Sequence, residues 1–175
     1  SLLDVMWEDA DKLLDTSWAQ PAIFAIQMGL ANVMDWLGMR PAAVLGHSVG
    51  QYAAACVAGV MTWQDGIRLI AERGRLIGSL PTGGVMLAVF APLSDVENEL
   101  RSHDALSLAA SNGTHNVISG PSDKIDVIAE QLSQRGIRAT KLETSHAFHS
   151  ALMDPILEPF SEVANRVAFQ SPKIP

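Results

Sequence analysis

The 175-residue chain is long enough for one domain with a sizeable hydrophobic core, or for part of a larger domain. Its formal net charge of −7 argues against nucleic acid as a partner, because such partners are bound by basic surfaces. A single cysteine excludes an internal disulfide and fits a reducing compartment. With no signal peptide and no apolar run of about eighteen residues, the sequence predicts a cytoplasmic protein without a membrane span.

The first 82 residues are predicted to form the N-terminal part of an α/β core. Ser17 opens a capping-box pattern, and apolar residues then recur at helical spacing, namely Ile23, Ile26, Leu30, Val33, Met34 and Leu37. The apolar run at 41–45 predicts a buried strand, and the small residues up to about Ala58 predict a helix after it. Thr62 begins a second capping box, which predicts another helix.

Residues 83–143 are predicted to form a small inserted subdomain. The predicted strands are 85–90, 106–110, 116–119 and 137–142, and the predicted helices are 94–102 and 122–135. Their order, β-α-β-β-α-β, is that of the ferredoxin-like split motif. Residues 144–175 are expected to return to the core. The sequence therefore predicts an α/β fold with an α/β-hydrolase-like core and an inserted ferredoxin-like subdomain.

The pentapeptide Gly46-His47-Ser48-Val49-Gly50 lies between the predicted strand and the predicted helix. In this context G-x-S-x-G is the pattern of a nucleophile elbow, which presents the serine at the top of a sheet. The amides at the start of the following helix favour a developing oxyanion. The pattern indicates acyl transfer through an acyl-serine; the alternative is a glycine-rich turn with a serine helix cap.

A serine nucleophile needs a base, and the candidates are the five histidines His47, His103, His115, His146 and His149. His47 adjoins Ser48 on a tight turn, where successive side chains point apart. His146 and His149 lie where the small subdomain returns to the core, which favours a place in a cleft wall. A metal site at these two residues would lack a third ligand nearby, so no metal is expected.

Arg73 has two interpretations. It lies in a predicted helix next to Glu72, which favours an exposed arginine paired with a neighbouring acid. Gly74 follows it, however, and would allow a close approach to a cleft. There the planar guanidinium could bind a carboxylate in bidentate fashion.

Five stretches of the chain match one family in the family's own order. They are Ala19-Gln20-Pro21-Ala22-Ile23-Phe24-Ala25, Gly46-His47-Ser48-Val49-Gly50-Gln51-Tyr52, Arg73-Gly74-Arg75-Leu76, Ala110-Ser111-Asn112-Gly113 with Val117-Ile118-Ser119-Gly120, and Ser145-His146-Ala147-Phe148-His149-Ser150-Ala151-Leu152-Met153-Asp154-Pro155. Together they resemble the acyltransferase domain of modular polyketide synthases, which belongs with the malonyl-CoA:acyl-carrier-protein transacylases of fatty acid synthesis.

The resemblance implies a role for each matching residue. Ser48 matches the nucleophile and His149 the base of a Ser-His dyad, and the Val49 amide would be one oxyanion donor. Arg73 matches the arginine that binds the free carboxylate of the extender unit. The His146-to-His149 sequence, His-Ala-Phe-His, resembles that of malonyl-selective domains, where methylmalonyl-selective domains tend to carry Tyr-Ala-Ser-His. Phe148 would fill the space of an α-methyl group, a difference of about 1–3 kcal/mol.

The resemblance also implies the partners: malonyl-CoA, an acyl carrier protein that brings its own phosphopantetheine, and other domains of a polyketide synthase. No bound cofactor, nucleic acid or membrane is expected. Because the chain starts at Ser1 without the family's Gly-Gln-Gly loop and ends at Pro175, we expect it to be cut from a longer protein at both ends. Two alternatives remain open at this point, a thioesterase of the α/β-hydrolase class and a non-catalytic docking piece of a synthase.

Overall fold

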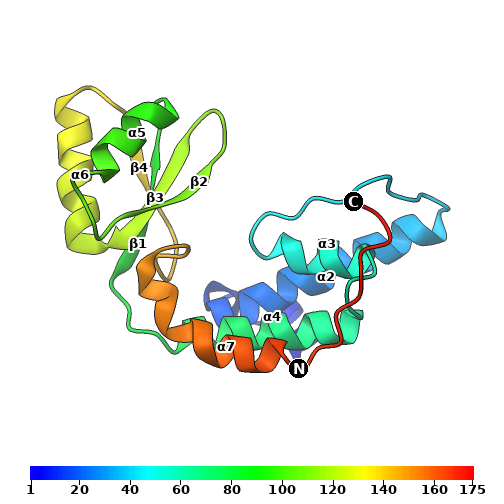
Figure 1. The fold of residues 1–175 in the computed structure, drawn as a ribbon. Helices are drawn as coiled ribbons and strands as arrows, with labels where there is room; N and C mark the ends of the chain where they lie inside the picture. The colour runs from blue at the N-terminus through cyan, green and yellow to red at the C-terminus, as the bar shows by residue number, and fades with distance from the viewer. The chain divides into compact units, whose positions relative to one another are not determined.

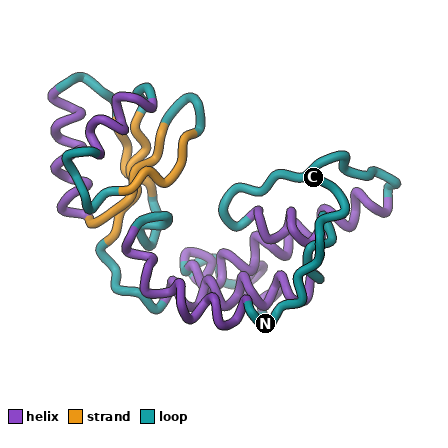
Figure 2. The backbone as a smooth tube through the Cα atoms, viewed as in Figure 1, coloured by secondary structure: helices purple, strands orange, loops and turns teal.

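The computed structural model describes residues 1–175 and divides into two compact units (Figure 1). The first unit combines Ser1–Ser79 with Glu158–Pro175, and the second is Leu80–Leu157. The second unit contains the whole of segment 83–143 and the loop and helical turns that follow it. All strands belong to the second unit (Figure 2).

The first unit is built from helices around a small core. Its elements are α1 (Leu2–Glu8), η1 (Lys12–Leu14), α2 (Thr16–Trp36), α3 (Gly50–Val57), α4 (Trp63–Gly78) and α7 (Leu157–Ala164). Helices α2 and α4 pack along one another, and α3 packs on both. Phe24 of α2, Ala53 of α3 and Ile70 of α4 form the buried core where these helices meet.

The two long helices begin at side-chain caps. The predicted cap at Ser17 is wrong by two residues: helix α2 begins at Thr16 with Asp15 as its N-cap, and the Asp15 carboxylate accepts a hydrogen bond of 2.8 Å from the Ser17 backbone N–H. Helix α4 begins as predicted, with the Thr62 hydroxyl accepting from the Asp65 N–H at 3.1 Å. Each cap satisfies a donor that the first helical turn leaves without a partner.

The predicted buried strand at 41–45 is wrong for this structure. The segment has no strand assignment, and Leu45 is 99% exposed. The one backbone hydrogen bond from residues 41–45 to another segment runs from Val44 N–H to Pro175 O, at 2.9 Å. A strand requires a ladder of such bonds with a neighbouring strand, and no segment of residues 1–175 supplies one.

Helix α2 has two apolar faces. Phe24 is 1% exposed against α3 and α4, whereas the predicted helical-spacing residues are exposed, namely Ile23, Ile26, Leu30, Val33, Met34 and Leu37. The predicted helix is confirmed, but its periodic apolar residues form an exposed face and not the buried one. None of the helices, α2 included, combines the length and apolar character needed to span a membrane.

The second unit has its elements in the predicted order. They are β1 (Gly84–Val89), α5 (Leu93–Leu100), β2 (Ser107–Ser111), β3 (Asn116–Pro121), α6 (Ser122–Gln134), β4 (Ala139–Leu142) and η2 (Ala151–Ile156). The strands form one sheet in the order β2-β3-β1-β4, and all neighbours are antiparallel. Leu87 of β1 lies opposite Ile118 of β3. Both pack with Val96 of α5 and Ile128 of α6, so the two helices share one core with the sheet.

Candidate active site

Ser48 lies in a tight turn that leads directly into α3. Its φ is 50°, in the left-handed region that residues other than glycine rarely adopt. The turn closes through hydrogen bonds from Gly50 N–H to His47 O at 2.9 Å and from Gln51 N–H to Ser48 O at 3.1 Å. A Cβ atom on Gly46 would lie 2.3 Å from the Gln51 backbone, so only glycine fits there. The turn and the following helix fit the predicted nucleophile elbow, whereas the strand that this motif places before the serine is absent.

Val49 follows the serine and occupies the N-cap position of α3. Its N–H has no backbone acceptor in the chain, as expected for one of the first amides of a helix. An oxyanion at this point would therefore meet an unpaired donor and the positive end of the helix dipole. Gln27 of α2 reaches the same turn, and it lines a cavity of about 360 Å³ together with Gly46 and Gly50.

Arg73 projects from α4 and is half-buried. Its Nη1 donates a hydrogen bond to Gln20 Oε1 on α2, and Gln20 Nε2 donates to Thr16 Oγ1 at 2.6 Å. Burial lowers the pKa of the Arg73 guanidinium below its usual value, while the neighbouring Tyr52 opposes that shift. Burial in turn raises the pKa of the Tyr52 hydroxyl. Arg73 is thus a partly desolvated cation held by a neutral amide.

The interpretation of Arg73 as an exposed arginine paired with a neighbouring acid is wrong. Glu72 pairs instead with the exposed Arg75, whose Nε lies 2.8 Å from Glu72 Oε2. Gly74 allows Arg73 to be half-buried, because a Cβ atom on Gly74 would lie 2.8 Å from the Thr16 backbone oxygen. Helix α4 therefore lies close against the start of α2 beside the arginine.

The second unit holds the other candidates, in the loop between β4 and η2. His149 is exposed and has a φ of 60°. The next residue, Ser150, is buried; its Oγ donates to Ala147 O at 2.7 Å and accepts from Leu152 N–H at 3.3 Å. These two bonds enclose His149 and maintain the turn. A Cβ on Gly84 would lie 2.5 Å from Ala147 Cβ, so this glycine lets the loop rest on the start of β1.

His146 is a buried support of the same loop. Its Nε2 donates to Leu80 O at 3.3 Å, and its Nδ1 accepts from Ser145 Oγ at 3.0 Å. Its ring meets the half-buried Phe148 ring edge-on, with centroids 6.2 Å apart. No group of three His, Cys, Asp or Glu side chains is placed to hold a metal ion.

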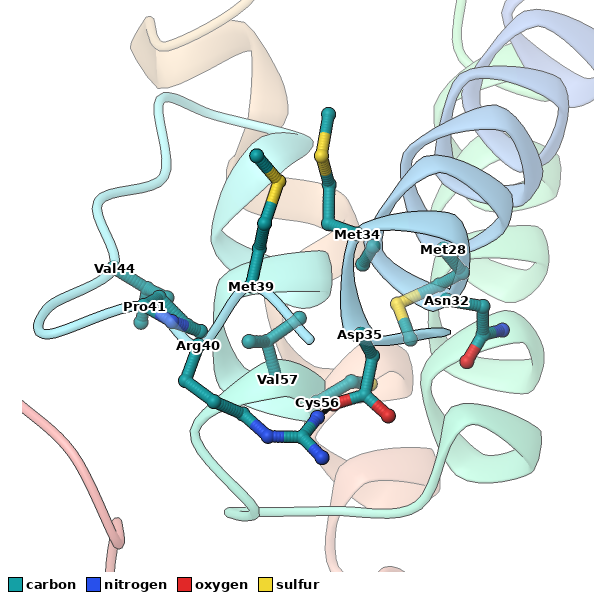
Figure 3. A pocket seen from close by; sticks show the side chains of 11 residues that line it. Met28, Asn32, Met34, Asp35, Met39, Arg40, Pro41, Val44, Cys56 and Val57 are labelled. Atoms are coloured by element: carbon teal, nitrogen blue, oxygen red, sulfur yellow. Dashed lines mark ion pairs between the residues drawn. The ribbon is translucent and has the colours of Figure 1, made fainter. Parts of the chain in front are cut away.

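The largest of the cavities described here lies apart from all these residues. It measures about 550 Å³, and Figure 3 shows it lined by apolar side chains from the end of α2, the following loop and α3, with an ion pair between Asp35 and Arg40. None of the predicted site residues lines it. It is a gap beside the uncovered face of α2 and not a part of the candidate site.

The structure groups the predicted residues into two sets. Ser48, Val49 and Arg73 belong to the first unit, and the loop residues His146 to His149 belong to the second. Sequence reasoning missed Gln20 and Ser150 as supports of these side chains. Both lie inside matching stretches, and the signal for Gln20 was a polar residue in an apolar helix, although its partner is 53 positions away.

Comparisons with known proteins agree on one family. The sequence profile described as "Acyl transferase domain" matches residues 1–175. The phenolphthiocerol synthesis polyketide synthase Pks15/1 of Mycobacterium marinum is 43% identical over 175 residues, covering 99% of this chain and 8% of that protein. The mycoketide-CoA synthase of Mycobacterium tuberculosis is 42% identical over 175 residues, covering 99% of this chain and 4% of that protein.

Solved structures give the same result. The acyltransferase domain from the second module of the salinomycin polyketide synthase matches with a TM-score of 0.96 at 39% identity, covering 100% of this chain and 42% of that chain. The acyl-carrier-protein S-malonyltransferase of Bartonella henselae matches with a TM-score of 0.90 at 35% identity, covering 99% of this chain and 60% of that chain.

The mixed α/β fold therefore matches that of solved acyltransferase structures. The chain belongs to the acyl transferase domain family and is an acyltransferase domain of the polyketide synthase kind. It spans less than two thirds of each relative named above, from 4% of the mycoketide-CoA synthase to 60% of the malonyltransferase.

Proposed function

We propose that this domain moves a malonyl group from malonyl-CoA to Ser48 and then to the phosphopantetheine thiol of an acyl carrier protein. The observation that carries the proposal is Ser48 itself, a residue at φ 50° in a tight turn before α3. Such a turn exposes a hydroxyl beside helix amides, where acyl transfer needs it. The proposed architecture is an α/β-hydrolase-like core with a ferredoxin-like subdomain, within a polyketide synthase.

In the first half-reaction, His149 accepts the Ser48 hydroxyl proton as Oγ attacks the thioester carbonyl carbon. The Val49 N–H donates to the oxyanion of the tetrahedral intermediate. The carbon–sulfur bond then breaks, and His149 returns the proton to the sulfur of CoA. The products are malonyl-Ser48 and free CoA.

In the second half-reaction, the carrier thiol gives its proton to His149 and its sulfur attacks the ester carbonyl of malonyl-Ser48. The bond from the carbonyl carbon to Ser48 Oγ breaks, and His149 returns the proton to that oxygen. The carrier supplies phosphopantetheine, so the domain needs no bound cofactor. This sequence of steps predicts ping-pong kinetics.

The choice of extender unit is assigned to Arg73 and Phe148. Arg73 would bind the free malonyl carboxylate, which is supported by its burial and by its lack of a carboxylate partner. Phe148 would occupy the space of an α-methyl group, and the buried His146 would hold the Phe148 ring through their edge-on contact. Methylmalonyl-CoA would then be the weaker donor.

The test is intact-protein mass spectrometry of the full-length protein after brief exposure to equal amounts of malonyl-CoA and methylmalonyl-CoA. We expect a mass gain of one malonyl group that Ser48→Ala abolishes. Methylmalonyl loading would retain acyl transfer and contradict the assigned extender. Release of CoA and malonate without an adduct would mean a thioesterase, and neither adduct nor turnover would mean a docking piece without catalysis.

A further inference from the structure

One end of the sheet in the second unit carries three planar side chains that no step of the proposed reaction uses. Because all strand pairs are antiparallel, the ends of β1 and β2 lie beside the starts of β3 and β4. Phe90 follows β1, His115 precedes β3 and Arg138 precedes β4. The Phe90 backbone N–H donates to Arg138 O at 2.9 Å, which extends the pairing of β1 and β4 by one residue.

Arg138 and His115 both contact the Phe90 ring. The guanidinium carbon of Arg138 lies 3.8 Å from the centroid of that ring, a close cation–π contact. The centroids of the Phe90 and His115 rings are 5.5 Å apart, and the ring planes are inclined by 33°. Phe90 is 38% exposed and Arg138 is also exposed. These three residues therefore form a planar cluster that solvent reaches.

Neighbouring side chains hold the planar cluster in place. The Asn112 Nδ2 donates to His115 Nε2 at 3.0 Å, and a neutral imidazole that accepts at Nε2 carries its proton on Nδ1. His115 Nδ1 then donates to Thr114 Oγ1 at 3.2 Å. The buried Asn116 donates from Nδ2 to Ala91 O at 2.8 Å and so ties the chain after β1 to the start of β3. The cluster is therefore arranged before any ligand binds.

The charge of Arg138 is available to a ligand. Three other basic residues of this unit each form an ion pair, namely Lys124, Arg135 and Lys141. Arg138 forms none, and its contact with the Phe90 ring leaves its charge intact. A guanidinium stacks through its faces and donates hydrogen bonds along its edge, so an anion can bind the edge while the stack persists. On a chain of net charge −7, an anionic ligand needs such a local cation.

A planar, cationic surface suits a ligand that combines an aromatic base with phosphate groups. Bases stack on aromatic rings and on guanidinium planes, and phosphate oxygens accept paired hydrogen bonds from arginine. CoA carries an adenine nucleotide at the end remote from its thiol, whereas the phosphopantetheine arm of a carrier protein carries no base.

We propose that Phe90, His115 and Arg138 form a subsite for the nucleotide end of malonyl-CoA. Arg138 supplies the charge that binds phosphate, and the rings supply the stacking surface. The subsite would serve the first half-reaction only, because the carrier protein brings no nucleotide. This inference rests on the proposed function, in which malonyl-CoA is the acyl donor.

The experiment compares two malonyl donors in steady-state kinetics of the full-length protein. Malonyl-CoA carries the nucleotide, and the malonyl thioester of N-acetylcysteamine lacks it but presents the same reacting atoms. We expect Arg138→Ala to raise the KM for malonyl-CoA by about tenfold and to leave kcat within about twofold, because the lost contact is equal in the ground state and the transition state. The kcat/KM for the nucleotide-free donor should change by less than about twofold.

Two further variants test the ring and the position of the charge. Phe90→Leu keeps an apolar side chain but removes the planar surface, and a smaller rise of about threefold in the KM for malonyl-CoA is expected, because Arg138 still binds phosphate. Arg135→Ala is the matched control, since Arg135 is an exposed arginine of the same unit that pairs with Glu99. It should leave the KM for both donors within about twofold. Because malonyl-CoA and methylmalonyl-CoA carry the same nucleotide, the ratio of their loading rates should not change in these variants.

A binding measurement separates the planar cluster from catalysis. The probe is adenosine bisphosphate, the phosphorylated nucleoside of CoA, which has no acyl group. We expect it to bind the wild-type protein in isothermal titration calorimetry and to compete with malonyl-CoA, and Arg138→Ala should weaken its binding by about tenfold. ATP is the second probe. Binding of ATP that depends on Arg138, with a KM for malonyl-CoA that does not, would overturn the assignment to CoA.

The outcomes distinguish the inference from the proposed function. Wild-type protein that is malonylated by neither donor would overturn the proposed function. Malonylation by both donors, with an unchanged KM for malonyl-CoA in Arg138→Ala, would overturn the nucleotide subsite alone. A raised KM for the carrier protein in place of malonyl-CoA would also overturn it and assign this surface to the carrier. Equal losses with both donors, together with a lower melting temperature, would mean that the planar cluster is only structural.

Discussion

Ser48 and His149 share a backbone conformation that no other non-glycine residue of the chain adopts, with φ values of 50° and 60°. A side chain in this left-handed region costs about 1–2 kcal/mol, because Cβ approaches the following carbonyl oxygen. The residues proposed as nucleophile and base are therefore the two non-glycine sites where backbone strain of this kind opposes folding. Strain of this kind persists where surrounding structure holds it for function.

The strain at His149 predicts that glycine will fit the site better than alanine. His149→Gly and His149→Ala both remove the imidazole, so both should lose transfer to Ser48. Glycine adopts φ 60° without a steric penalty, and we expect its variant to be more stable by about 1 kcal/mol in urea unfolding. Ala54→Gly inside α3 is the matched control and should instead destabilise by about 1 kcal/mol. Equal stability of the two His149 variants would show that the backbone conformation at residue 149 does not lower the stability of the protein.

Arg73→Ala should convert the domain from a malonyl to a simple acyl transferase. Loss of a charge-assisted bidentate bond is expected to lower malonyl loading by about 10- to 100-fold, while acetyl loading is retained or improved. Arg75→Ala is the matched control, since Arg75 is exposed and pairs with Glu72. Its loading rates should stay within about threefold of wild type. Equal losses for malonyl and acetyl donors in Arg73→Ala would exclude the carboxylate-binding role.

Ser150→Ala should loosen the turn that presents His149. Its hydroxyl bonds to both Ala147 O and Leu152 N–H, and a buried carbonyl would lose its partner. We expect a loss of about 1–2 kcal/mol in unfolding free energy and slower loading with malonyl and acetyl donors alike. Ser133→Ala removes an exposed hydroxyl on α6 of the same unit and should have a much smaller effect on stability. Loading of the Ser150→Ala variant at the wild-type rate would show that the two Ser150 hydrogen bonds are not needed to position His149.

Local signals were sufficient for most of the secondary structure. The cap at Thr62, the helical period of α2 and the alternation of short runs in 83–143 depend on neighbours a few residues apart, and each corresponds to an element of the structure. The strand predicted at 41–45 is wrong because a strand depends on distant residues and not on local signals. Apolar composition favours a strand, but hydrogen-bond partners decide it, and these lie far away in the sequence.

The candidate site was predictable only in part. Ser48 and the His146-to-His149 loop carry sequence motifs, because their geometry is determined over a few residues. Gln20 also lies in a matching stretch, but its contact with Arg73 could not be predicted from neighbouring residues, because Arg73 is 53 positions away on another helix. A polar residue on an apolar helix face indicates that a hydrogen-bond partner lies nearby in the fold, but the sequence does not identify that partner.

Phe148→Ser should widen the range of extender units. The Phe148 ring is half-buried and is steadied edge-on by His146, so its removal leaves room for at least a methyl group. Because one methyl group in a pocket is worth about 1–3 kcal/mol, the ratio of malonyl to methylmalonyl loading should fall by about 10- to 100-fold. Phe90→Ser, at a partly exposed phenylalanine of the same unit, should leave the ratio unchanged. A folded Phe148→Ser protein with the wild-type ratio would move the selection of the extender to other residues.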